Sequence, residues 1–165
     1  MDDARQGGRV SMESQLHAFA FQTGDWVVRH RKLAQRLAGE VNWLEFGGSC
    51  RAYEILDGAG NVDDFLIDDP GGAYRAATFR RLDPTTGDWS IYWADSRRDG
   101  LDPPMRGRFH NGIGTFFGSD MLDGREIMVR FIWSDIGPAR ARWEQAFSLD
   151  GREWEVNWIM RFARV

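Results

Sequence analysis

The sequence has one cysteine, three histidines and no long apolar run, and each shortage excludes a class of structure. With Cys50 alone no intrachain disulfide can form, so the fold does not depend on disulfide bonds. No apolar stretch approaches the ~20 residues that a membrane-spanning helix needs, and we expect no membrane association. His17, His30 and His110 lack metal-ligand spacing, so we expect no metal site.

Excess positive charge is also missing. The formal net charge is −4 at pH 7, which argues against a general nucleic-acid surface, because binding of a phosphate backbone needs a concentrated cationic patch. An arginine cluster suited to one small anion remains at Arg97, Arg98, Arg106 and Arg108. We therefore expect no nucleic-acid partner.

Signals for nucleotide cofactors, nucleophilic catalysis and secretion are absent too. Gly71 and Gly72 precede neither a helix nor a phosphate-loop lysine, and Ser49 and Cys50 lack an identifiable base, so we expect no cofactor and see no established catalytic constellation. Residues 1–14 are charged and contain no apolar signal-peptide core. We expect a flexible tail over 1–14, a single domain over 15–165 and a cytoplasmic protein.

Aromatic residues, in contrast, are abundant. Eight tryptophans and eleven phenylalanines stand against three tyrosines, in a chain of 165 residues that is long enough for one core. Rings of this size must be housed in a core, a cavity wall or an interface.

Hydrophobic periodicity predicts an all-β protein. A short helix is expected over 15–22, and from Asp25 the period becomes two, with Trp26, Val28 and His30 on one face. Further strands are predicted at 42–56, 62–67, 74–82, 89–95, 106–110, 113–122, 126–134, 140–149 and 154–163. Asn-Gly and Asp-Gly pairs between the later strands suit tight hairpins. About ten strands in up-and-down order favour an antiparallel β-barrel over a sandwich.

Several motifs carry a family resemblance. Gly24-Asp25-Trp26 follows the predicted helix, Arg164 lies near the end, and Trp89-Ser90-Ile91-Tyr92-Trp93 and Asn157-Trp158 stand between them. The pattern resembles a bacterial lipocalin-like family of unknown function within the calycin group. The resemblance implies a barrel with an internal pocket and an arginine packed over Trp26. In shape the haem-binding nitrobindin group is a neighbour, but its late-strand histidine ligand has no counterpart after His110, so haem held in that way is not expected.

Strand alternation predicts which side chains line the pocket. The inward sets include Trp93 and Asp95, Trp133, Trp143 and Gln145, and a last set of Trp154, Val156, Trp158, Met160 and Phe162. The alternative is that the rings simply fill the barrel as core.

His30 is the polar residue expected at mid-strand in the cavity. It serves either as an anchor for a ligand or as a neutral core histidine. Asp95 or Glu45 are its candidate partners, or partners of Arg108, and Gly47-Gly48 would permit a bulge that changes the face of Glu45. The predicted ligand-binding residues are thus His30, Glu45, Trp93, Asp95, Arg108, Trp133, Trp143, Gln145 and Trp158.

Three functions fit this pattern. The first is binding of a small, largely apolar or aromatic molecule within the barrel. The second is a small cofactor-independent isomerase, cyclase or hydrolase in which His30 and a carboxylate move a proton. The third is a filled barrel that acts through a dimer or partner interface, with exposed aromatics such as Tyr92 or Phe116.

Overall fold

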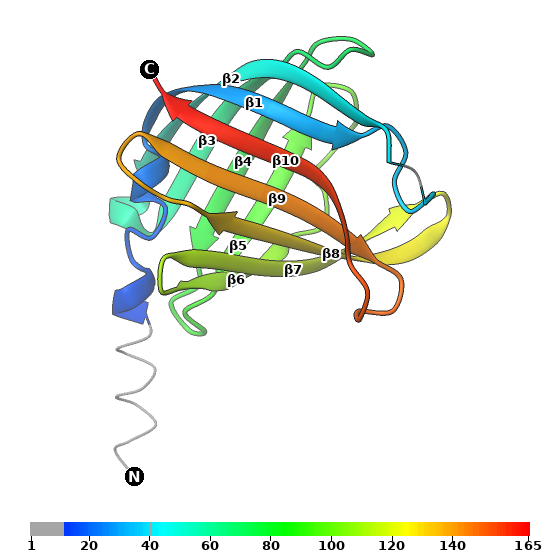
Figure 1. The fold of residues 1–165 in the computed structure, drawn as a ribbon. Helices are drawn as coiled ribbons and strands as arrows, with labels where there is room; N and C mark the ends of the chain where they lie inside the picture. Colours follow the sequence, from blue (N-terminus) through cyan, green and yellow to red (C-terminus); the bar gives the residue numbers. More distant parts are fainter. Residues whose placement is uncertain (1–11, 40) are drawn as a thin grey trace.

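Ten antiparallel strands close into a single barrel in the computed structural model, which describes residues 12–39 and 41–165 (Figure 1). Each strand pairs with its neighbours in the chain, and β1 closes the barrel against β10. The strands are β1 (Gly24–Leu33), β2 (Trp43–Ile55), β3 (Gly60–Ile67), β4 (Tyr74–Leu82), β5 (Trp89–Asp95), β6 (Met105–His110), β7 (Ile113–Leu122), β8 (Arg125–Ser134), β9 (Arg140–Ser148) and β10 (Glu155–Arg164). The predicted barrel class and up-and-down order are confirmed.

The hairpin turns owe their geometry to residues that tolerate positive φ. Asn111 and Gly112 join β6 to β7 with φ of 49° and 76°, and Asp123 and Gly124 join β7 to β8 with φ of 50° and 78°. Paired positive φ values give the tight turns whose twist matches that of the flanking strands. The Asn-Gly and Asp-Gly pairs therefore mark these hairpins correctly.

The short helical segment predicted before β1 is present, but it begins earlier, at Met12, and is interrupted. Residues 12–15 form a helical turn and η1 (Ala20–Gln22) a second one of 3₁₀ type, while His17 between them has a φ of 60°, which a continuing helix cannot contain. Of the expected tail 1–14, residues 1–11 lie outside the described residues. Among those described, no helix is long and apolar enough to span a bilayer.

This segment closes one end of the barrel. Phe19, which is 1% exposed, packs edge-on against Trp89 and Phe109 with ring centroids 5.0 Å away in both cases. Beside it the Trp26 indole donates to the carbonyl of Gln22 at 2.7 Å. The Arg164 guanidinium covers the Trp26 ring at 4.0 Å, as the resemblance implied.

A buried ion pair lies next to the segment that closes this end of the barrel. Arg80 and Asp63 are 2.8 Å apart with side-chain exposures of 4% and 0%, and Arg80 also donates to Gln22 and Asn61. The charges are paired and hydrogen-bonded, which is the condition under which a protein interior tolerates them. The closed end is therefore filled and offers no route into the barrel.

An irregularity in β10 overturns part of the predicted alternation. The pairing of β10 with β9 shifts between Val156 and Trp158. Trp158, Met160 and Phe162 face inward as expected, but Trp154 lies outside, where it packs on Phe117 and under the guanidinium of Arg130. A bulge inserts one residue, so alternation holds on each side of it but not across it.

Candidate functional site

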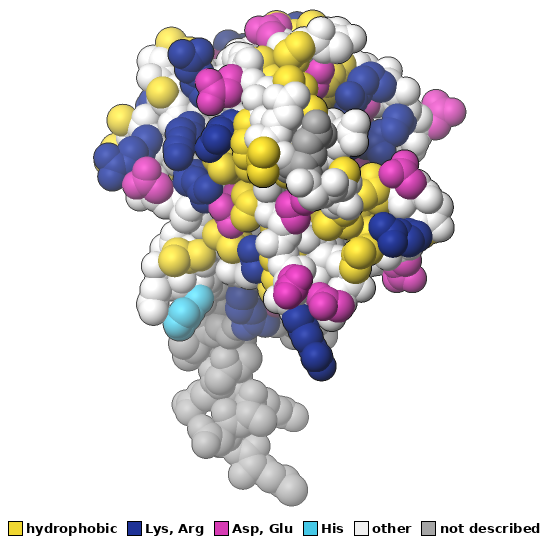
Figure 2. All heavy atoms as spheres, turned by 45° about the vertical axis from the view of Figure 1, so that its right-hand side comes forward, with side chains coloured by type: hydrophobic (Ala, Val, Ile, Leu, Met, Phe, Trp, Pro, Cys, Tyr) yellow, Lys and Arg dark blue, Asp and Glu magenta, His cyan; other side chains and the backbone are white. Residues whose placement is uncertain are grey.

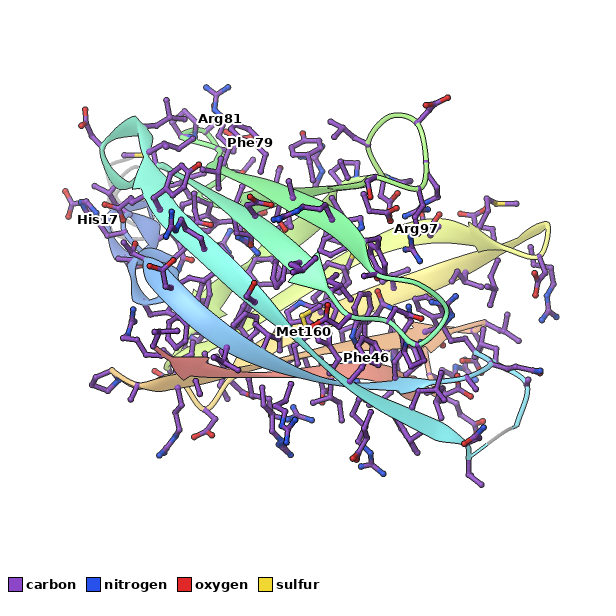
Figure 3. The ribbon with its side chains drawn as sticks, turned by 90° about the horizontal axis from the view of Figure 1, so that it is seen from above. His17, Phe46, Phe79, Arg81, Arg97 and Met160 are labelled. Atoms are coloured by element: carbon purple, nitrogen blue, oxygen red, sulfur yellow. The ribbon has the colours of Figure 1, made fainter. Side chains whose placement is uncertain are left out.

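The opposite end of the barrel leads into a cavity of about 420 Å³. β5 and β6 pair over only Trp89–Ile91 and Met105–Gly107, and beyond this they diverge, with residues 96–104 forming the loop between them. Asp102 of that loop donates its amide to the Trp93 carbonyl at 2.8 Å. Figure 3 views the barrel from above, with Arg97 towards this open end and His17 at the closed one.

The deeper wall of the cavity is aromatic. Trp158 meets Trp93 and Trp143 edge-on, with ring centroids 6.1 and 5.5 Å away, and Phe131 packs on Trp143 at 4.9 Å. Each ring fixes its neighbour in the edge-to-face geometry that aromatic pairs prefer. The sequence-predicted residues Trp93, Trp143 and Trp158 are thus brought together on one lining surface.

Trp133, in contrast, lies too deep to reach this cavity. It is 2% exposed, and its ring is 5.3 Å from that of Phe21 and 5.2 Å from that of Phe162. It lines only a small void of about 30 Å³, which shares Trp93, Phe131 and Trp143 with the main cavity. Its inward orientation agrees with the alternation, but its position belongs to the core below the site.

His30 faces inward but stands behind the wall of the cavity. The Trp158 indole Nε1 donates to His30 Nδ1 at 3.1 Å, and the imidazole stacks on Phe46 with centroids 4.9 Å apart. Burial, followed by the charge of Lys32, lowers the pKa of His30 to about 4, so the ring is neutral at neutral pH. His30 does not line the main cavity, because the Trp158 indole lies between them.

Asp95 lies at the mouth of the cavity, and its carboxylate is hydrogen-bonded to neighbouring side chains. Its carboxylate, with a side-chain exposure of 0%, accepts hydrogen bonds from Arg97, Arg98 and the Trp93 indole. Burial alone would raise the pKa of Asp95, but these bonds, led by those from Arg97, hold it well below its usual range. The carboxylate therefore fixes the two arginines and does not approach His30.

Glu45 and Arg108 are corrections to the predicted orientation. The pairing of β1 with β2 is unbroken, so no bulge forms at Gly47-Gly48, and Glu45 lies opposite Arg31 on the outer face with 76% of its side chain exposed. Arg108 also faces outward and binds the Asp88 carboxylate at 2.7 Å. Neither lines the cavity.

Gln145 lies on the cavity wall, and its amide donates to Asn157 Oδ1 at 2.8 Å. Asn157, which alternation places outside, is 0% exposed because it occupies the irregular step of β10.

Phe116, named in the sequence analysis as an exposed aromatic, is also 0% exposed, and its neighbour Phe117 is the exposed ring at 49%. Phe116 is therefore not available to the dimer or partner interface suggested in the sequence analysis.

Two cations at the mouth were not predicted from the sequence. Lys32 follows His30 on the same inner face of β1, and its Nζ lies 4.3 Å from the Trp158 ring centroid. Arg36, in the loop after β1, lies over Phe147 at 5.9 Å. Continued alternation from His30 would have identified Lys32, whereas nothing in the sequence places the side chain of a loop residue such as Arg36.

The comparisons with known proteins identify the fold alone. No protein-family model matches the chain, and no curated protein matches it. Among solved structures, the crystal structure of Rv2717c from M. tuberculosis superposes with a TM-score of 0.59, covering 91% of this chain and 96% of that chain at 10% sequence identity.

Proposed function

We propose that this protein is a lipocalin-like binding protein that holds a small, largely apolar or aromatic molecule inside the barrel. The observation that carries the proposal is the cavity of about 420 Å³, open at one end of the barrel and walled by Trp93, Trp143 and Trp158. This volume lies within the ~300–1,000 Å³ range of small-molecule sites.

The indole wall of the cavity suits a ligand that contains apolar rings. Burial of apolar surface contributes ~25 cal/mol per Å², and edge-to-face contacts with indoles add to it. Because Trp158 is fixed by its hydrogen bond to His30, the wall loses little freedom when a ligand enters. Gln145 supplies an amide beside the rings, which suits a ligand with a few polar atoms.

The geometry favours binding over proton-shuttling catalysis. His30 is separated from the cavity by Trp158, Asp95 is bonded to Arg97 and Arg98, and Glu45 lies outside. A general base must lie within hydrogen-bond reach of the proton that it removes. His30 and Glu45 both border a second, separate pocket. Among the described residues, however, no hydrogen bond or ion pair joins His30 to Glu45 or Asp95.

Titration with N-phenyl-1-naphthylamine, an uncharged apolar fluorophore, tests the proposal. We expect saturable binding, with emission that rises as the probe leaves water. Val129 lines the cavity and Met128 beside it is 43% exposed, so Val129→Trp fills the cavity while Met128→Trp adds the same ring outside. Binding should weaken at least tenfold only in Val129→Trp. Equal binding in both folded variants, or no binding to the wild type, would overturn the proposal.

A further inference from the structure

The charges around the cavity mouth are unevenly matched. Arg97 and Arg98 each lie 3.1 Å from the Asp95 carboxylate, and Arg98 lies at the same distance from Asp102. The two positive and two negative charges of these four side chains neutralise one another. The carboxylates at this part of the mouth are thus already occupied by the two arginines of the loop after β5.

Lys32 and Arg36 line the same mouth without such partners. Within the described residues neither forms an ion pair, and the contacts of both cations are with rings, Trp158 for Lys32 and Phe147 for Arg36. Asp120, the remaining acid of the lining, is bonded to the amide of Met121 and forms no ion pair with them. The cavity therefore has two cations at its entrance with no carboxylate of the described residues at ion-pair distance. Asp69 and Asp95 act on Lys32, and Asp123 on Arg36, only from further away.

Partial burial of Lys32 and Arg36 disfavours their charged forms. Burial is the main cause that lowers the pKa of Lys32, to about 8, and it also lowers the pKa of Arg36. A charge withdrawn from water is stabilised when an opposite charge and hydrogen-bond acceptors reach it. An anion at the mouth would supply both.

The arrangement also fixes an orientation. The cations stand at the rim and the indoles of Trp93 and Trp143 lie deeper, so charge is matched at the entrance and apolar surface below it. Figure 2, in which the right-hand side of Figure 1 comes forward, shows Lys and Arg side chains on this face interspersed with acidic and apolar ones. A molecule with an apolar ring and one acidic group matches both regions at once.

We infer that the ligand is an amphipathic anion, a ring-bearing acid whose carboxylate, sulfonate or phosphate group binds between Lys32 and Arg36 while its apolar part enters the indole-lined cavity. This inference rests on the proposed function. It adds the charge of the ligand and its direction of entry, neither of which follows from an apolar cavity alone.

Two fluorophores with one skeleton separate the two claims. 1-Anilinonaphthalene-8-sulfonate carries a sulfonate on the rings of the uncharged N-phenyl-1-naphthylamine. Both are titrated into the wild type, Lys32→Met, Arg36→Gln and the double variant. Arg29→Gln removes a like charge from the outer face of β1 and is the matched control. Thermal unfolding of each variant reports whether it is folded.

We expect the sulfonate probe to bind the wild type at least tenfold more tightly than the uncharged probe does. The ratio of the two affinities should fall at least tenfold in the double variant, by an intermediate factor in each single variant, and stay unchanged in Arg29→Gln. If the uncharged probe binds but the ratio is near one, or survives the double substitution, the anion site is overturned while the binding function stands. If neither probe binds, the proposed function itself fails.

Displacement of the sulfonate probe distinguishes the sources of the anion. 1-Naphthylacetic acid, 1-naphthyl phosphate and the uncharged 2-(1-naphthyl)ethanol share a ring and differ in the head group. We expect the carboxylate or the phosphate, or both, to displace the probe at least tenfold better than the alcohol, and the better anion identifies the ligand chemistry. Equal displacement by the alcohol would contradict an anionic ligand.

Discussion

The indole Nε1 of Trp158 donates a hydrogen bond to Nδ1 of His30 over 3.1 Å, so a cavity-wall ring is held by a histidine behind it. An imidazole that accepts through Nδ1 is neutral with its proton on Nε2, and His30 keeps this form because burial disfavours its charge. His30 is thus a positioning residue for Trp158.

His30 should make the stability of the protein fall in mild acid. Its pKa is about 4 in the folded chain and 6.5 when exposed, so the unfolded chain binds more protons between these values. The stabilisation is present above pH 6.5 and is lost as pH falls towards 4. Between pH 7 and 5 we expect a loss of about 2 kcal/mol from this group. Urea unfolding of the wild type and His30→Gln at both pH values measures it, and identical losses would contradict it.

Arg164 should stabilise the closed end through its shape as well as its charge. Besides covering Trp26, it donates to the carbonyls of Thr23, Phe21 and Pro138 at 2.6, 2.9 and 2.7 Å. Lysine keeps the charge but cannot make this planar set of bonds, so Arg164→Lys should cost ~1–3 kcal/mol. Arg161→Lys, on the outer face of the same strand, should stay within ~0.5 kcal/mol. Equal unfolding midpoints for the two variants would show that the three bonds contribute nothing.

The buried Arg80–Asp63 pair should be far more sensitive than an exposed pair. Asp63→Asn leaves Arg80 charged in the interior and should cost ~3–5 kcal/mol. Asp25→Asn breaks the exposed pair with Arg51, where both side chains are more than half exposed, and should change the unfolding midpoint far less. Denaturant unfolding of both variants checks the contrast, and a similar cost at the two sites would refute it.

Binding of the sulfonate probe should weaken in alkaline solution. Lys32 has a pKa of about 8 and faces Arg36, Asp69, Arg97 and Asp95 from the surrounding loops and β5. The anion is attracted while Lys32 is protonated, so affinity should be full near pH 7 and fall severalfold by pH 9.5, where the sulfonate itself does not titrate. Lys32→Arg should remove this dependence because arginine stays protonated. A flat profile in the wild type would contradict the role of Lys32.

Much of the fold could be predicted because its signals are local. Asn-Gly and Asp-Gly pairs require positive φ, and alternation between them places Trp93, Trp143 and Trp158 inside, as the structure has them. The rest depends on effects that alternation does not contain. Strand alternation predicts which face of the sheet a residue occupies but not how deep in the barrel it lies. His30 and Trp133 therefore point inward without lining the main cavity. The irregular step in β10 and the conformation of the loop that carries Arg36 are set by tertiary packing.

A crystal structure with N-phenyl-1-naphthylamine tests the central claim most directly, because it locates the bound molecule. We predict density for the probe inside the barrel, in contact with Trp93, Trp143 and Trp158, with the hydrogen bond from Trp158 to His30 unchanged. Density only on the outer surface, at a concentration that saturates binding in solution, would contradict a ligand site in this cavity.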